Sequence, residues 1–434
     1  MNADPPSTSL LQPGVRRREV WAWAMYDFAN SGYTTVVLTA VFNAYFVGVV
    51  AGKAEWATFA WTAALGVSNA LVMLLMPALG AYADLRAAKK RLLVLATTGC
   101  VLATAALAWA GPGDLWWAVA AVVFSNLFYA IGESLIAAFL PELARPAALG
   151  TVSGWGWSFG YFGGMLSLGA CLAWVLSAQA QGQSAQQFVP VTMLITAAIY
   201  AVAALPTFAL LRERAVPQAA KGSSWRESFS RLSHTWREAR RLRDFGWLLA
   251  CGASYQAGIT VVIALAAVYA EQVLGFQQSQ TMVLVFLVNI ASAVGAFAFG
   301  YGQDRIGHRP ALALTLAGWI VMVALAHQAT SAFLFWCAAV VAGLCMGSSQ
   351  SAGRALAGLL APPARRAEFF ALWTFATRLA AVIGPVTYGL VTWMSSGDHR
   401  LAILSTGLFF VLGLLLLLPI DVERGARAAA LESK

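Results

Sequence analysis

The sequence predicts an all-α polytopic membrane protein with twelve transmembrane helices, arranged as two pseudo-symmetric bundles of six. The first observation is composition: the 434 residues are 60% hydrophobic and 11% charged, whereas a soluble domain carries about 25% charged residues. The second is that apolar runs recur along the chain, each near the length of about 20 residues that a bilayer requires. The third is that sequence features repeat at an offset of 220 residues.

The apolar runs divide the chain into two groups of six. They cover 27–50, 57–82, 92–111, 115–140, 151–178 and 189–211, and then 246–270, 281–302, 310–328, 332–358, 367–394 and 401–420. The first run is too long for a signal-peptide core and lacks a small-residue cleavage site, so we expect a retained span. The predicted divisions are an N-terminal tail (1–20), a first bundle (21–211), a basic central loop (212–245), a second bundle (246–420) and a C-terminal tail (421–434).

The central loop is the longest polar stretch between apolar runs. Its second half, residues 225–243, has helical spacing, with aromatic side chains at Trp225, Phe229 and Trp236. An amphipathic helix lying on the membrane surface would show this pattern. A plain solvated linker is the alternative, and the sequence leaves both open.

The basic residues predict the orientation of the chain. With a cytoplasmic N-terminus, all but four of the 28 Lys and Arg residues fall on the cytoplasmic side; the exceptions are Lys53, Arg354, Arg378 and Arg400. Positive charge in short loops marks the cytoplasmic face, which places both termini there. The net charge of +9 is therefore interpreted as a topology signal and not as a nucleic-acid surface.

The fixed offset relates the two groups of spans. Gly80 and Asp84 recur as Gly300 and Asp304, each pair in a G-x-x-x-D pattern. Other matches are Gly32 with Gly252, Trp116 with Trp336, Gly164 with Gly384, and Ala144-Arg145 with Ala364-Arg365. Duplication of a six-span unit explains several matches at one offset, as in transporters built from parallel repeats. Shared composition bias is the competing explanation.

The repeated pattern resembles the loop motif G-x-x-x-D-R/K-x-G-R/K-R/K of the major facilitator superfamily. The copy between spans 8 and 9 holds Gly300, Asp304, Arg305, Gly307 and Arg309, with His308 at one basic position. The copy between spans 2 and 3 keeps Gly80 and Asp84 but has Leu85 and Ala87 where that family prefers a basic residue and a glycine. This departure weakens the prediction of a tight turn there.

An aspartate at the C-terminal end of a helix faces the unfavourable end of the helix dipole and needs nearby cations or the N-terminus of another helix. Such a contact can form in one state of the protein and break in another. The resemblance implies a latch at the cytoplasmic gate that favours the outward-open state. A loop that only anchors topology is the simpler alternative.

A second resemblance lies in the first span. Residues 26–33, Tyr-Asp-Phe-Ala-Asn-Ser-Gly-Tyr, resemble the signature Y-D-W-A-N-S-A-Y of the vacuolar amino-acid effluxer branch, which includes bacterial members of unassigned substrate. A weaker likeness links Asp27 and Asn30 to the cation-coupled glycoside symporters. These resemblances imply a multi-pass protein of the bacterial inner membrane.

Polar side chains inside the spans mark the candidate site. A charge at mid-bilayer costs at least about 2.5–3.5 kcal/mol, so such groups are expected to face a cavity and work there. Glu133 shares one helical face with Tyr129 and Asn126, and Gln350 lies one turn from Arg354. The other candidates are Asp27, Asn30, Tyr33, Gln256 and Arg378.

In the major facilitator fold, spans 1, 4, 7 and 10 line the central cavity. The resemblance therefore implies that Glu133 and Arg354 face each other across it. An acid and a base around one space suit a zwitterion such as an amino acid. The alternative is a buried pair, of Glu133 with Arg354 or Arg378, that only fixes helix packing.

Glycines at four-residue spacing are predicted to allow close helix packing. One stripe holds Gly156, Gly160 and Gly164, flanked by Trp155 and Trp157, and another holds Gly343 and Gly347. We interpret the stripes as contacts between helices that slide as the halves move, and the tryptophans as lipid or interface contacts.

The predicted function is secondary transport of a small polar solute, with amino-acid efflux or exchange favoured and with protons or a cation as coupling ion through Glu133 or Asp27. The alternatives are a cation-coupled sugar or other solute symporter, and a non-transporting sensor or assembly protein.

An enzyme is disfavoured, since the four histidines do not pair at metal spacing and no G-x-x-x-x-G-K-[ST] motif occurs. The five cysteines lie singly in apolar runs. We expect a monomer contacting membrane lipids and a small-molecule substrate, with no cofactor, metal or nucleic acid.

Overall fold

The structure is a computed structural model that describes residues 10–52, 54–217, 242–274, 278–396 and 398–432. Within these ranges, twelve helical segments are long and apolar enough to cross a membrane. This number confirms the twelve spans predicted from the apolar runs. The predicted interfacial helix at 225–243 lies almost entirely outside the described residues.

The first six spans form one bundle. They are α1 (Arg17–Tyr33) with η1 (Thr34–Ala40), α2 (Phe42–Tyr45) and η2 (Phe46–Val50); α3 (Ala57–Arg86); α4 (Lys89–Ala106) with η3 (Leu107–Trp109); α5 (Leu115–Ala137) with α6 (Leu140–Leu143); η4 (Pro146–Ala148) with α7 (Leu149–Ala180); and α8 (Ala185–Leu210). The first helix starts well before its apolar run because Trp23 and Tyr26 are fully buried in the bundle, so protein contacts extend it.

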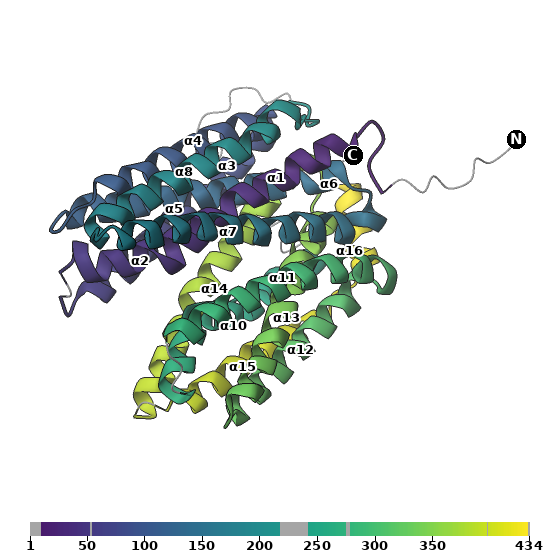
Figure 1. Cartoon of the computed structure of the whole chain (residues 1–434). Coiled ribbons are helices and arrows are strands. Elements are labelled where there is room, and N and C mark those ends of the chain that lie inside the picture. The colour runs from purple at the N-terminus through teal and green to yellow at the C-terminus, as the bar shows by residue number, and fades with distance from the viewer. Residues whose placement is uncertain (1–9, 53, 218–241, 275–277, 397, 433–434) are drawn as a thin grey trace, which may run out of the picture.

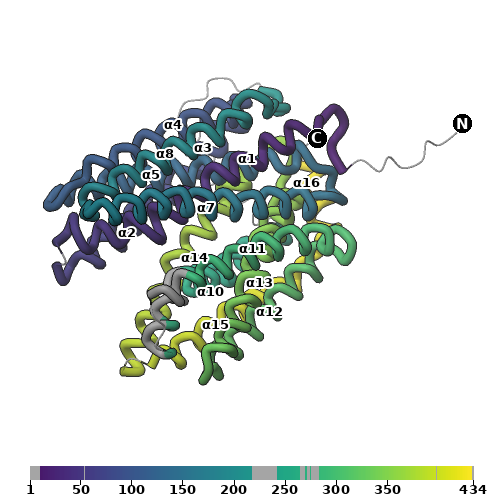
Figure 2. Tube along the Cα trace, viewed as in Figure 1, coloured from purple at the N-terminus to yellow at the C-terminus, as the bar shows by residue number. Residues whose placement is uncertain are grey.

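The second six spans form the other bundle. They are α10 (Arg243–Leu274), α11 (Gln278–Ile306), α12 (His308–Gln328), α13 (Ala332–Leu360), η5 (Pro363–Arg365) with α14 (Arg366–Met394), and α15 (His399–Leu417). A short helix, α16 (Val422–Leu431), follows the last span. In the chain trace the first half runs from purple to teal and the second half from green to yellow (Figure 2).

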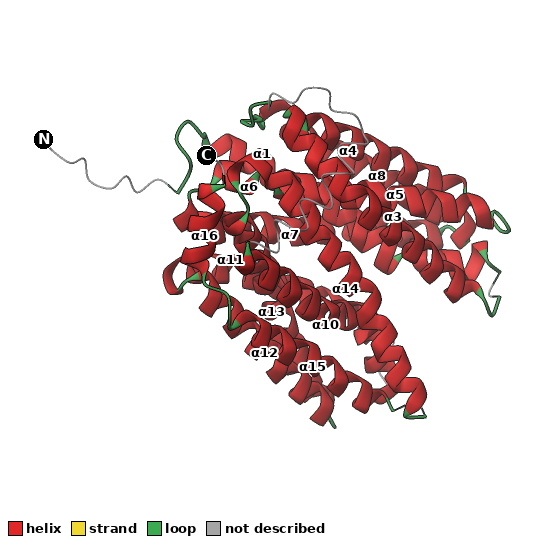
Figure 3. Ribbon diagram, turned by 180° about the vertical axis from the view of Figure 1, so that it is seen from behind, coloured by secondary structure: helices red, strands yellow, loops and turns green. Residues whose placement is uncertain are grey.

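The two bundles meet at one end. Figures 1 and 3 show them close together where α6, α16 and the described chain ends lie, and farther apart at the opposite end. We call the first the terminal end and the second the far end. The contact between bundles is made mainly by α7 against α11 and by α3 against α14.

Each bundle is closed by an ion pair at the terminal end. Arg214, just after the sixth span, donates from Nη2 to Glu19 Oε2 in the first turn of α1 at 2.8 Å. Arg424, just after the twelfth span, donates from Nη2 to Asp244 Oδ1 in the first turn of α10 at 2.6 Å. Both pairs tie the last span of a bundle back to its first, and neither crosses between bundles.

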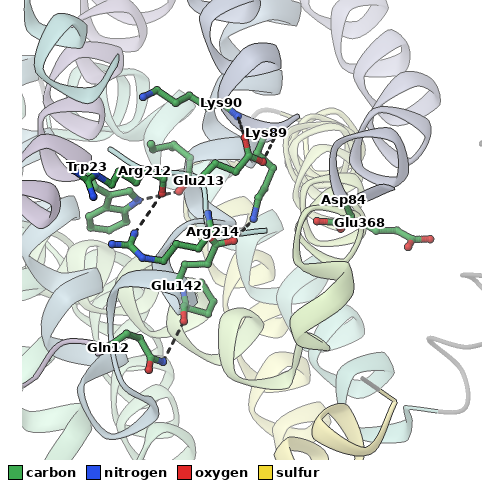
Figure 4. Close-up of polar contacts among 12 residues, drawn as sticks. Gln12, Trp23, Asp84, Lys89, Lys90, Glu142, Arg212, Glu213, Arg214 and Glu368 are labelled. Atoms are coloured by element: carbon green, nitrogen blue, oxygen red, sulfur yellow. Dashed lines mark hydrogen bonds and ion pairs between the residues drawn. The ribbon is translucent and has the colours of Figure 1, made fainter. Parts of the chain in front are cut away.

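The segment after α8 also caps a neighbouring helix. The carboxylate of Glu213 accepts hydrogen bonds from the backbone N–H groups of Lys89 at 2.8 Å and Lys90 at 3.1 Å, the first residues of α4. The Lys89 ammonium is buried and paired with Glu142 (Figure 4). Negative charge at a helix N-terminus is stabilising, so this segment, with Arg214, holds the terminal end of the first bundle together.

Glycine sets the spacing of helices inside the second bundle. A Cβ atom on Gly347 of α13 would collide with the carbonyl oxygen of Ser292 on α11. We expect Gly347→Ala to lower the free energy of unfolding by about 1–3 kcal/mol, the usual cost of overpacking. Thermal unfolding in detergent would measure this loss. Gly389→Ala, where a Cβ would meet no atom of the described residues within 4 Å, is the control, and equal stability of the two variants would contradict the prediction.

Candidate functional site

The second loop motif binds the other bundle. Asp304, near the end of α11, accepts hydrogen bonds from the backbone N–H groups of Gly150 at 2.9 Å and Thr151 at 2.8 Å, at the start of α7. The positive end of the α7 dipole therefore stabilises a carboxylate that its own helix disfavours. Gly300 makes the approach possible, since a Cβ there would lie 2.9 Å from the Gly150 carbonyl oxygen.

The first loop motif makes the equivalent contact where α3 meets α14, on the other side of the interface between the bundles, which we call the seam. Asp84, near the end of α3, accepts a hydrogen bond from the backbone N–H of Glu368 at 2.9 Å, at the start of α14 (Figure 4). A Cβ on Gly80 would lie 2.7 Å from the Ala367 carbonyl oxygen. The two aspartates thus form a pseudo-symmetric pair of contacts between bundles at the terminal end.

Both motif turns form, including the one that the sequence made doubtful. Gly307 has a φ of 95°, and Ala87, at the position of the missing glycine, has φ 49° and ψ 51°. Alanine in this left-handed region is unfavourable by about 1–2 kcal/mol, so packing around the turn must compensate. Of the basic residues, Arg305 is exposed and Arg309 donates to the Leu418 carbonyl oxygen of its own bundle.

A second layer of contact between bundles is an ion pair. Arg354 of α13 donates from Nη1 to Asp27 Oδ2 of α1 at 2.6 Å. It also donates from Nη2 to the Ser153 carbonyl oxygen at 2.8 Å and from Nε to Ser153 Oγ at 3.1 Å, on α7. The two ionic side chains are 7% and 10% exposed. The pair is therefore sealed inside the protein.

Aromatic rings and a glycine complete the surroundings of Arg354. Its guanidinium carbon lies 4.7 Å from the ring centroid of Trp23 and 5.3 Å from that of Trp157. A Cβ on Gly156 would collide with the Asp27 carboxylate and lie 2.5 Å from Arg354 Nη2. The predicted packing glycine thus also makes room for an ion pair, and Trp157 contacts a cation, in place of the lipid contact expected.

A second ion pair joins the bundles through different spans. Arg378 of α14 donates from Nη2 to Glu133 Oε2 of α5 at 2.7 Å. The Glu133 side chain is 35% exposed and that of Arg378 is 16% exposed, so this pair is more open than the pair of Arg354. The Arg378 guanidinium also lies 5.8 Å from the ring centroid of Tyr129, which stacks on Tyr33 at 5.3 Å.

The partner of Arg354 differs from the one that the resemblance placed opposite it, whereas the partner of Glu133 is one of the two that we considered from the sequence. Arg354 binds Asp27, and Glu133 binds Arg378. Under the offset of 220, residue 353 corresponds to Glu133, so Arg354 lies at nearly the same depth as Glu133, but equal depth does not decide the partner.

The uncharged candidates lie in smaller clusters. Gln256 donates to Gln350 Oε1 at 2.6 Å within the second bundle. Asn126 donates to Ser68 Oγ at 3.0 Å within the first bundle, and its own amide oxygen is buried without a partner among the residues that the structure describes. Tyr33 and Ser125 share a hydroxyl contact at 2.9 Å, while Asn30 is buried in α1. Each of these three hydrogen bonds joins helices of the same bundle.

Several residues of this site were not among the predicted candidates. Ser153, Trp23 and Trp157 all contact Arg354. Trp23 lies three residues before the branch signature, and Trp157 flanks the glycine stripe. Their proximity to these two features was the signal in the sequence that could have identified them. Among the described residues, no group of three His, Cys, Asp or Glu side chains could hold a metal ion.

Comparison with known proteins adds a family and a fold. A family model described as "Vacuole effluxer Atg22 like" matches residues 43–430. YxiO of Bacillus subtilis (strain 168), described as an uncharacterized MFS-type transporter, is 26% identical over 410 residues, which is 91% of this chain and 93% of that protein. Autophagy-related protein 22-1 of Aspergillus niger is 27% identical over 252 residues, or 53% of this chain and 41% of the fungal protein.

Solved structures show the same architecture. The human organic anion transporter MFSD10 gives a TM-score of 0.72 at 16% identity, covering 94% of this chain and 100% of that one. The major facilitator superfamily transporter FucP gives 0.73 at 14% identity, covering 93% and 100%. At these identities the likeness establishes the fold alone, and it confirms the predicted arrangement of twelve transmembrane helices.

Proposed function

This chain belongs to the vacuole effluxer Atg22-like family of major facilitator transporters, and from that premise we propose that it moves a small zwitterionic solute, such as an amino acid, across the bacterial inner membrane. The fold and family support a multi-pass secondary transporter. The class of solute, the coupling and the membrane are our proposal.

The pair of Glu133 and Arg378 carries the proposal. It joins the two bundles in the middle of spans 4 and 11 and is partly exposed, unlike the sealed pair of Asp27 and Arg354. A solute with an ammonium and a carboxylate can replace both partners, because Glu133 accepts from the first and Arg378 donates to the second. Neither charge is then left unpaired in the membrane, where an isolated charge is costly.

The direction of opening follows from the predicted topology. If the basic terminal end is cytoplasmic, as the positive-inside pattern favours, the described state is closed toward the cytoplasm, with the helices of the two bundles farther apart on the outer side (Figure 1). The contacts of Asp84, Asp304 and Arg354 would then form the cytoplasmic closure. Separation of the bundles there would release Asp27 from Arg354, and a proton on Asp27 would then remove its charge, which is the route of proton coupling that we propose for efflux or exchange.

Flux in proteoliposomes tests the proposal. Purified protein is reconstituted and screened with amino acids, peptides and sugars, with and without a pH gradient. We expect amino-acid flux that Glu133→Gln and Arg378→Ala each lower at least about tenfold, because each variant leaves one charge of the solute unpaired.

Glu423→Gln, an exposed acid on α16, is the matched control and should transport normally. Normal flux and normal pH dependence in both site variants would contradict the site. Saturable binding of a solute without any flux would instead support a sensor on the same fold.

A further inference from the structure

The first bundle contains a complete receptor for one cation. Its acceptors are the Asp27 carboxylate on α1 and the carbonyl and hydroxyl oxygens of Ser153 on α7, all within 3.1 Å of the guanidinium nitrogens of Arg354. The cation itself comes from α13 of the second bundle. The receptor therefore belongs to the first bundle and the bound cation to the second, and alternating access requires these two bundles to move relative to each other.

Two indole rings give this receptor a preference for a flat cation. The rings of Trp23 and Trp157 lie 4.7 and 5.3 Å from the guanidinium carbon. Guanidinium is planar and weakly hydrated, and it combines hydrogen bonds at its edge with contacts of its face to aromatic rings, which a compact ammonium does less well.

Contacts within the first bundle hold the receptor in shape. The Trp23 indole N–H donates to the Ile136 carbonyl oxygen at 2.8 Å, so the ring is oriented by α5 and not by Arg354. The absence of a side chain on Gly156 leaves the space in which the Asp27 carboxylate and the guanidinium meet. The receptor is thus expected to persist when its occupant leaves.

We propose that this receptor, defined by Asp27, Ser153, Trp23, Trp157 and Gly156, is a binding site for guanidinium compounds that Arg354 fills as a tethered ligand. When the bundles part at the terminal end, Arg354 leaves with α13 and Asp27 loses its counter-charge inside the membrane. A free guanidinium group entering from the terminal end restores every contact that Arg354 made. This occupation in the working cycle rests on the alternating access of the proposed function, but the receptor itself does not.

The test is a chemical rescue of a variant that lacks the tethered ligand. Full-length Arg354→Ala protein is purified in detergent, and its thermal unfolding is followed in 0–20 mM guanidinium chloride, with sodium chloride and tetramethylammonium chloride at equal ionic strength as controls. We expect a saturable rise in the unfolding temperature with guanidinium alone and a midpoint in the millimolar range.

Two comparisons make the result specific. Two proteins should show a rise in unfolding temperature with guanidinium that is at least tenfold smaller than the rise in Arg354→Ala. They are the wild type, whose site is filled, and the double variant Asp27→Asn/Arg354→Ala, whose site lacks its carboxylate. Equal stabilisation by all three salts, or rescue that survives loss of Asp27, would overturn the proposal. If Arg354→Ala does not purify, Arg354→Gln is used in the same series, with the same criteria.

This experiment requires no flux. A failed rescue with normal amino-acid transport would reject the receptor and leave the proposed function standing. Successful rescue in a protein that transports nothing would support the receptor and reject the proposed function.

Discussion

Replacing Arg354 by alanine is expected to cost the protein about 3–5 kcal/mol of stability, the usual loss when one partner of a buried ion pair is removed. The reason is that Asp27 stays buried between the bundles without the cation and loses its main hydrogen bond. Removing the second charge as well, in Asp27→Asn/Arg354→Ala, should recover most of this loss, because no uncompensated charge remains. Thermal or denaturant unfolding in detergent measures both changes.

An exposed arginine provides the control for this cycle. Arg91→Ala, on the surface at the start of α4, removes the same charge and should change stability by less than about 0.5 kcal/mol. If the double variant were as unstable as Arg354→Ala alone, the loss would come from packing around the guanidinium and not from the stranded carboxylate.

A large side chain at Gly154 is expected to abolish transport without unfolding either bundle. Gly154 lies on α7 at the seam, and a Cβ there would collide with the Ala296 carbonyl oxygen on α11 of the other bundle. Gly154→Leu would therefore keep α7 and α11 apart and prevent closure at the terminal end. We expect flux to fall at least about 100-fold, because a carrier that cannot close on one side cannot complete its cycle.

Labelling distinguishes this effect from a folding defect. With the five native cysteines replaced, a reporter cysteine at Thr151 should react faster with a membrane-impermeant maleimide applied from the terminal side in Gly154→Leu than in its parent. Gly169→Leu places the same side chain on the same helix, at a position where no atom in the described part of the chain lies within 4 Å of a Cβ, and it should transport and label like the parent. A fully active Gly154→Leu variant would show that this contact is not required for closure.

The architecture was predictable because it is encoded in simple patterns. Apolar runs fix the number of spans, and the recurrence of Gly80 and Asp84 as Gly300 and Asp304 relates the halves. For both aspartates the helix dipole predicted a need for nearby cations or for the N-terminus of another helix, and the structure shows a helix N-terminus at Glu368 and at Gly150.

The pairing of charges was harder to predict. Sequence spacing gives the depth of a residue along its helix, but the partner depends on helix tilt and rotation, which packing against neighbours determines. Glu133 and Arg354 occupy similar depths in the two halves, yet each binds another partner. Trp157 shows a second limit, because a tryptophan beside an arginine on another span has the same sequence pattern as one that faces lipid.

The closing ion pairs of Arg214 with Glu19 and of Arg424 with Asp244 have a consequence for how the chain can be divided. Each of these ion pairs is complete within its own half, so we expect each half to keep its fold without a covalent link to the other. A cell that produces residues 1–217 and 242–434 from two separate reading frames should therefore assemble a working carrier from the fragments. By the same reasoning, a half from one relative could be combined with the complementary half of another, provided that the partners of Asp84, Asp304 and Arg354 are kept.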